Sequence, residues 1–238
     1  MKEFEYYNIF ESKGAEYLIT IVFFTLLVPF WLILRWAIRK PAPREAGYAI
    51  TEDRLLVPKG ILFSKNHSWA YMARNGDAIV GMDDLVQHLT GDLKVNLLKE
   101  KGDEIKKGDL MGILEADGRN LSVFAPVSGK IDGVNHEVME KEGLYNRDPY
   151  GDGWFYRIEP SAWRKETASY YLADESVSWI NKELGRIRDF LSETVSRSSS
   201  GGEGLVLQEG GYPSESALRS IPEDGWKDFQ REFLENMA

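Results

Sequence analysis

The side chains with the most chemical potential in this chain are three histidines, His67, His88 and His136, and the carboxylate pair Asp83-Asp84. Imidazoles bind metals or move protons, and paired carboxylates do acid–base work. The histidines lie far apart in the sequence, and none has a metal-ligand spacing such as His-x-x-x-His. Asp83-Asp84 stands at a predicted helix start, where capping and the helix dipole alone favour carboxylates. We therefore expect structural roles for these residues, with no metal site, no catalytic residue and no enzymatic activity.

Composition excludes several further classes of function. The chain has 238 residues, a formal net charge of -9 and no cysteine. The lack of cysteine removes disulfides, iron–sulfur clusters, thiolate zinc sites and cysteine nucleophiles. Residues 1–44 carry six Lys/Arg against four Glu, a charge of +2, which leaves -11 for the remainder. A remainder this acidic argues against nucleic-acid binding, which needs clustered cations.

An apolar stretch from Tyr17 to Ile38 predicts a transmembrane helix. It has no charged residue from Leu18 through Leu34. At about 1.5 Å per residue it would extend roughly 33 Å as a helix, enough to cross the hydrocarbon core once. A cleaved signal peptide and a buried core helix are the alternatives. The signal peptide is disfavoured because glutamates precede the stretch and Arg35 follows it.

The charges beside this stretch predict its orientation. Four basic residues follow it within a few positions, Arg35, Arg39, Lys40 and Arg44. The positive-inside rule places basic flanks in the cytoplasm. We therefore expect a single-pass protein of the cell (inner) membrane, with a short outer tail (1–16), lipid contacts through 17–38 and a cytoplasmic C-terminal domain.

The rest of the chain divides into four predicted segments. Pro41 and Pro43 mark a linker over 39–58, because proline disfavours helix for itself and for the preceding residue. Over 59–192, short β-branched or aromatic runs alternate with Gly, Asp and Asn turns, a pattern typical of a small barrel or sandwich. A short helix is expected over 83–89. A longer helix from Asp174, with Val177, Ile180, Leu184, Ile187 and Leu191 on one stripe, closes the domain.

The C-terminal part reads as a linker followed by an amphipathic helix. Residues 193–211 include a Ser- and Gly-rich run, typical of a flexible linker. Residues 212–238 hold Trp226, Phe229 and Phe233 at helical spacing. Such a stripe either folds back on its own domain or docks into a partner's groove, and the sequence leaves both open.

The most specific stretch runs from Val95 to Gly129, VNLLKEKGDEIKKGDLMGILEADGRNLSVFAPVSG. Gly-Asp turns precede a strand, the pair Asp117-Gly118 suits a tight hairpin, and a return strand enters Ala-Pro-Val-Ser-Gly. This pattern resembles the lipoyl/biotinyl-carrier superfamily, and more closely the H-protein family of the glycine cleavage system. His67-Ser68-Trp69 and Pro149-Tyr-Gly-Asp-Gly-Trp154 resemble further motifs of that family. The resemblance implies a mainly β, barrel-sandwich hybrid fold with C-terminal helices.

One departure from the family pattern bears on function. The family's hairpin reads Glu-Ser-Val-Lys, and its lysine carries lipoate through an amide. This chain reads Glu115-Ala-Asp-Gly118, so Gly118 takes the place of that lysine, and no lysine occurs between Lys107 and Lys130. Arg119 cannot replace it, because a guanidinium stays protonated and is not nucleophilic. We therefore expect a degenerate lipoyl site and no cofactor.

These observations predict a membrane-anchored, non-lipoylated H-protein-like subunit for docking or assembly within a membrane complex, with a redox complex as one candidate. Its expected partners are membrane-complex subunits and a cytoplasmic protein. The expected contact residues are Asp117, Arg119, Asn120, Trp154, Trp226, Phe229 and Phe233. The alternative function is a lipoyl-type carrier of the aminomethyl group in glycine cleavage, or an adaptor that mimics H proteins toward lipoyl-handling enzymes.

Overall fold

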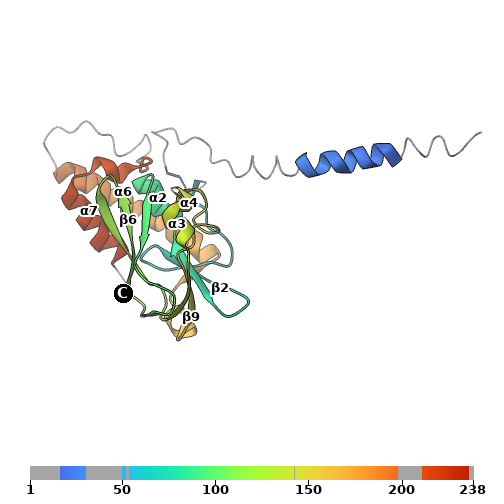
Figure 1. Cartoon of the computed structure of the whole chain (residues 1–238). Helices are drawn as coiled ribbons and strands as arrows, with labels where there is room; N and C mark the ends of the chain where they lie inside the picture. Colours follow the sequence, from blue (N-terminus) through green and yellow to red (C-terminus); the bar gives the residue numbers. More distant parts are fainter. Residues whose placement is uncertain (1–16, 31–49, 52–53, 142, 198–210, 236–238) are drawn as a thin grey trace, which may run out of the picture. The chain divides into compact units, whose positions relative to one another are not determined.

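The computed structural model describes residues 17–30, 50–51, 54–141, 143–197 and 211–235. Figure 1 traces the whole chain and labels its main helices and strands. The chain divides after Arg44 into two units, of which the second holds all the strands described below.

In the first unit the structure describes one helix, over residues 17–30, whose side chains are exposed. Among the described residues, no helix is both long enough and apolar enough to cross a membrane. Of the predicted transmembrane stretch 17–38, the structure describes residues 17–30. The rest of that span, residues 31–38, and the predicted outer tail, 1–16, lie outside the described residues.

Two antiparallel sheets build the second unit. One sheet has the order β10 (Tyr171–Leu172), β1 (Leu62–Phe63), β2 (Ser68–Met72), β3 (Ala78–Met82), β9 (Tyr156–Pro160), β8 (Gly129–Val134), β5 (Glu104–Ile105). The other has the order β4 (Lys94–Leu97), β6 (Leu110–Ala116), β7 (Arg119–Phe124). Alternate residues of β7 and β8 point into the core, among them Leu121, Val123 and Ile131. The prediction of a mainly β, barrel-sandwich-like domain is confirmed.

Hydrogen bonds between the two sheets fix how they face each other. The hydroxyl of Tyr156 on β9 donates to the carbonyl of Met111 on β6 at 2.7 Å. The hydroxyl of Ser68 on β2 donates to the carbonyl of Phe124 at the end of β7, at 3.1 Å. Both bonds lie at the domain core, where an unsatisfied polar group would be costly. The β6–β7 hairpin is therefore anchored at its base to the larger sheet.

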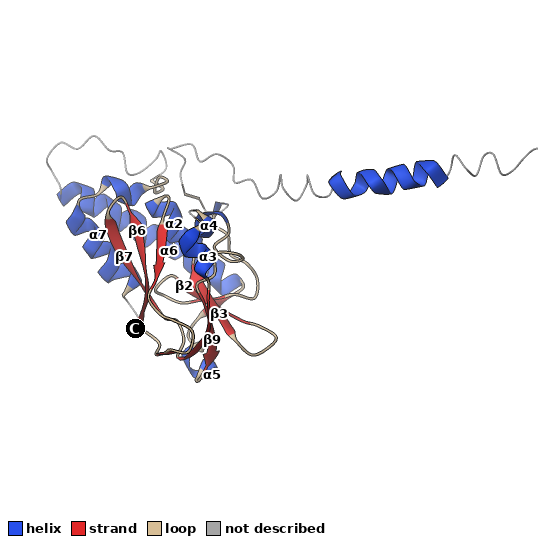
Figure 2. Cartoon of the chain, viewed as in Figure 1, coloured by secondary structure: helices blue, strands red, loops and turns tan. Residues whose placement is uncertain are grey.

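Helices cover one flank of the strands, and Figure 2 shows α7 beside β7. Asp83 caps the N-terminus of α2 by accepting from the amide of Val86 at 3.4 Å, which confirms the predicted capping role. The helical elements of the domain are α2 (Asp84–Thr90), α3 (His136–Glu140), α4 (Leu144–Arg147), α5 (Trp163–Glu166), α6 (Asp174–Arg197), the 3₁₀ turn η2 (Ala217–Ser220), α7 (Glu223–Phe229) and the π-helical turn η3 (Gln230–Leu234).

The C-terminal segment, residues 212–235, packs back onto its own domain, and we call it the strap. Phe229 and Phe233 stack with ring centroids 4.9 Å apart, and both rings contact Phe190 of α6. Trp226, Phe229 and Phe233 are buried. The structure thus supports the fold-back alternative. From the sequence we expected these three side chains to contact a partner, but they are buried within the chain's own domain.

Two predicted linkers differ from the structure at their ends. Ile50 and Leu55, placed in the 39–58 linker, are buried in the domain, and the amide of Ile50 donates to the carbonyl of Pro213. At the other linker, α6 continues to Arg197, so residues 193–197 are helical. The remaining part of that linker, 198–210, lies outside the described residues.

Truncation of a strap aromatic tests the fold-back directly. We expect Phe229→Ala to lower the free energy of unfolding by about 3–5 kcal/mol, because its ring is fully buried between the strap and α6. Val177→Ala on the exposed side of α6 is the matched control and should change stability by less than about 1 kcal/mol. Urea denaturation measures both, and equal small effects would contradict the packing of the strap.

Candidate functional site

The tip of the β6–β7 hairpin is a two-residue turn. Ala116 pairs with Arg119, which leaves only Asp117 and Gly118 between the strands. Their φ angles, 52° and 74°, are both positive, as a type I′ turn requires. A Cβ atom placed on Gly118 would meet no heavy atom within 4 Å. The predicted tight hairpin is confirmed, and its tip has open space around Gly118.

The strap contacts the residues on both sides of Gly118. Arg219 forms an ion pair with Asp117 at 3.0 Å between its Nε and the carboxylate. On the other side, Nη1 of Arg119 donates to the carbonyl of Ile221 at 3.0 Å. The Arg119 guanidinium also lies over the ring of Trp226, 5.4 Å from its centroid. The structure therefore brings together three of the predicted site residues, Asp117, Arg119 and Trp226.

Two recesses flank the tip. One has a volume of about 460 Å³, and its lining includes Asp92, Lys94, Glu115, Asp117 and Arg219. The other, of about 610 Å³, lies between β7 and the strap, and the exposed residue Asn120 lines it. The hairpin tip thus stands between two polar hollows.

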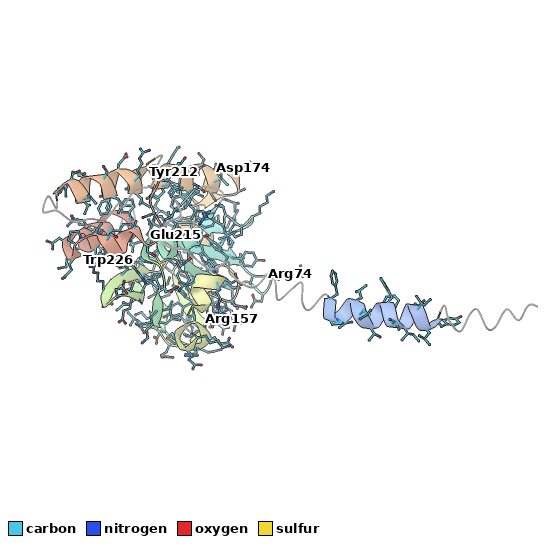
Figure 3. All side chains as sticks on the ribbon, turned by 90° about the horizontal axis from the view of Figure 1, so that it is seen from above. Arg74, Arg157, Asp174, Tyr212, Glu215 and Trp226 are labelled. Atoms are coloured by element: carbon cyan, nitrogen blue, oxygen red, sulfur yellow. The ribbon has the colours of Figure 1, made fainter. Side chains whose placement is uncertain are left out.

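The other predicted contact residues lie elsewhere. Trp154 precedes β9 and is half-buried, with the guanidinium of Arg157 5.3 Å from its ring centroid. Figure 3 labels Arg157 and Trp226 in separate parts of the domain. Phe229 and Phe233 lie under the strap against α6 rather than at a partner-facing surface. The predicted contact set is therefore divided among three environments.

Sequence reasoning missed two strap residues that contact the hairpin, Arg219 and Gln230. Gln230 accepts from the amide of Ser122 through its side-chain oxygen at 2.7 Å and donates to the carbonyl of Ser122 at 3.3 Å. A weak signal for it exists in the sequence. Gln230 lies four positions after Trp226, which places a polar residue on the apolar face of the helix. Arg219 carries no comparable signal.

A buried ionic cluster links three elements away from the tip. Nδ1 of His67 lies 2.8 Å from the carboxylate of Asp83, and its Nε2 lies 3.6 Å from the carboxylate of Glu183 on α6. The three side chains are essentially inaccessible. Arg186 makes a further ion pair with Glu183 at 2.8 Å. His67 thus lies inside a buried ionic cluster, and its ionic partners were not predicted from the sequence.

Burial and charge act in opposite directions on His67. Burial lowers its pKa, but the carboxylates of Asp83 and Glu183 outweigh burial and raise the pKa to about 10. His67 is therefore an imidazolium at neutral pH. The neighbouring Asp84 shows the converse behaviour, since burial raises its pKa to about 6 despite a hydrogen bond from the amide of Leu56.

The family model described as glycine cleavage H-protein matches residues 61–183, just over half of the chain. The chain belongs to the glycine cleavage H-protein family. The glycine cleavage system H protein of Carboxydothermus hydrogenoformans is 41% identical over 106 residues, which cover 44% of this chain and 81% of that protein. The probable H protein of Pyrococcus abyssi is 36% identical over 124 residues, covering 52% and 92%.

Among solved structures, the crystal structure of a glycine cleavage system H protein from Mycobacterium marinum aligns with a TM-score of 0.47 and 26% identity. The alignment covers 53% of this chain and 99% of the Mycobacterium marinum chain.

Membership of the H-protein family confirms the predicted resemblance and agrees with the expectation of a non-enzymatic protein. The names of the relatives favour the alternative prediction, a protein of the glycine cleavage type, over the membrane-anchored docking subunit. The family match ends at Glu183, so the strap lies beyond it. The H-protein hairpin of this chain has no lysine from residue 108 to residue 129.

Breaking the ionic cluster should destabilise the domain. Asp83→Asn keeps a good helix cap but removes the buried negative charge beside His67. We expect a loss of about 3–5 kcal/mol at pH 7, since the buried imidazolium loses its nearer carboxylate, at 2.8 Å, and keeps only Glu183, at 3.6 Å. Asp77→Asn in the exposed β2–β3 turn is the control and should be near neutral.

The pH dependence gives a second test. Because the pKa of His67 is raised in the folded state, its stabilising contribution is complete below about pH 6.5 and is lost as the pH rises through about 10. We expect the stability difference between wild type and His67→Asn to shrink over this range in chemical denaturation. A difference that stays constant from pH 7 to 10 would show that His67 is neutral when buried.

Proposed function

We propose that this chain is an adaptor of the H-protein family, which presents the family's surface to enzymes that handle H proteins. Its hairpin tip carries no lysine-linked group. The observation that supports this most directly is the turn itself: Asp117 and Gly118 supply no amine, and the tip faces open space. An amide-linked prosthetic group requires a primary amine at its attachment point.

The neighbouring basic residues do not replace that amine. Arg119 is engaged with Ile221 and Trp226, and its guanidinium is not a nucleophile. Lys107 precedes the other end of β6, where its Nζ donates to the carbonyl of Glu166 at 2.9 Å and lies 4.6 Å from the centre of the Tyr170 ring. Arg119 and Lys107 therefore serve structural contacts, and neither replaces the amine in the turn.

What remains available at the tip is a surface for recognition. The β6–β7 pair has a fixed register, and Asn120 is exposed beside the turn. A rigid hairpin presents its side chains without a large loss of conformational entropy on binding. An enzyme that recognises H proteins at this hairpin would meet the same backbone shape without a reactive group.

The carrier of an aminomethyl group is the second candidate function. It is favoured by 41% identity over four-fifths of a curated H protein. A carrier role would place the group on a residue outside the hairpin tip, and intact mass distinguishes the two functions.

Grafting a lysine onto the tip tests the adaptor. We expect the wild-type chain to keep its unmodified mass when it is co-expressed with a lipoate ligase and lipoate, whereas Gly118→Lys gains one lipoyl group. The new residue has open space, and its positive φ costs about 1–2 kcal/mol. Gly76→Lys is a matched control, because Gly76 also has a positive φ and open space but lies in the β2–β3 turn.

Intact-mass spectrometry has three outcomes that test the adaptor function against the carrier function. A lipoyl adduct on the wild-type chain would refute the adaptor and favour the carrier. An unmodified Gly118→Lys variant would refute recognition of the hairpin by the ligase in the chain with its C-terminal strap packed. Modification of both lysine variants would show that the ligase is not selective for the tip.

Direct binding tests the recognition surface. We expect Asn120→Arg to weaken binding to the glycine cleavage enzymes or to a lipoate ligase by about tenfold, roughly 1.4 kcal/mol, through a clash at the docked surface. Asn75→Arg in the exposed β2–β3 turn is the control and should bind as wild type does. Biolayer interferometry measures both, and equal affinities for the two variants would exclude the hairpin as the contact.

A further inference from the structure

The strap occupies the edge of the smaller sheet. β7 is the outer strand of the order β4-β6-β7, so one side of its backbone has no strand neighbour within that sheet. At Ser122 the side-chain amide of Gln230 takes both backbone groups, accepting from the N–H and donating to the C=O. A neighbouring strand would pair with these groups in the same way. The strap thus takes the position of an added strand at this point.

The strap also closes over the tip from both sides. Arg219 holds Asp117 and also donates through Nε to the carbonyl of Thr90 at 2.9 Å. Ile221 and Trp226 hold Arg119 from the opposite flank. Strap residues therefore engage the residue before Gly118 and the residue after it.

The two faces of the strap are held by different forces. Toward α6 the contacts are aromatic, between Phe190 and the rings of Phe229 and Phe233. Toward the hairpin the Arg219–Asp117 ion pair is exposed, with side chains 38% and 57% accessible, whereas Trp226 beneath Arg119 is buried. Exposed polar contacts exchange for water at little net cost, whereas separating buried aromatic rings loses their hydrophobic burial. The part of the strap that opens most readily is thus the Arg219–Asp117 end of its seam with the hairpin.

We propose that the strap is an autoinhibitory cover on the hairpin. In the closed state it occupies the β7 edge and both flanks of the tip, and it opens from the Arg219–Asp117 end of this seam while staying attached to α6. The inference rests on the proposed function, because the enzymes that handle H proteins are the molecules excluded by the closed strap. The strap lies beyond residue 183, where the family match ends, so this control is an addition to the family's domain.

One substitution and one amide test whether the strap moves as a unit. Arg219→Ala removes the contacts to Asp117 and Thr90 but leaves the acceptor of the Ser122 amide intact. If the strap opens cooperatively, hydrogen exchange at the Ser122 amide should become about tenfold faster in this variant. Lys227→Ala is the matched control, because the partner of Lys227 is Glu223 of the same helix. It should leave exchange at Ser122 unchanged.

Binding completes the test. We expect Arg219→Ala to bind a lipoate ligase or glycine cleavage enzyme about tenfold more tightly than wild type and Lys227→Ala, since less of the population is closed. Unchanged Ser122 exchange, or equal affinity of all three proteins, would overturn the autoinhibitory strap. Absence of binding by every protein would instead refute the adaptor function, and the exchange rate of Ser122 would then decide on strap opening alone.

Discussion

The domain depends on one buried imidazolium. His67 lies between Asp83 at the start of α2 and Glu183 in the middle of α6, so its charge joins the larger sheet to two helices. Removing His67 would leave two buried carboxylates without their shared cation, which is more costly than losing an exposed ion pair. The position of α6 on the barrel is therefore fixed by electrostatics as well as by its apolar stripe.

The position of α6 in turn decides what happens at the hairpin. Phe190, two turns beyond Glu183, contacts both phenylalanines of the strap. The strap then reaches the β7 edge and the tip through Gln230 and Arg219. These contacts form a chain of dependence. The buried charge positions α6, α6 positions the aromatic cluster, and the aromatic cluster positions the strap residues that contact the tip.

Local sequence patterns predicted the helices and turns, but they did not predict ion pairs between residues far apart in the sequence. Asp117-Gly118 predicted the tight turn because few other pairs accept two positive φ angles. The periodicity over α6 predicted a buried stripe, but Val177 is 44% exposed and Trp179 is buried instead, since the helix start packs beside His67 and Tyr171. The ionic cluster could not be predicted, because its members are separated by up to 116 positions and only the fold brings them together.

At the hairpin tip, the backbone geometry beside the turn does not depend on which side chain stands in the turn. A two-residue turn fixes the pairing of Glu115 with Asn120 and of Ala116 with Arg119, whatever side chain stands at the turn itself. Loss of an amine at position 118 therefore need not disturb the surface on either side of it. Glycine also relieves the strain that a side chain would meet at φ 74°. The backbone pairing on either side of the turn is thus independent of the side chain that stands in the turn.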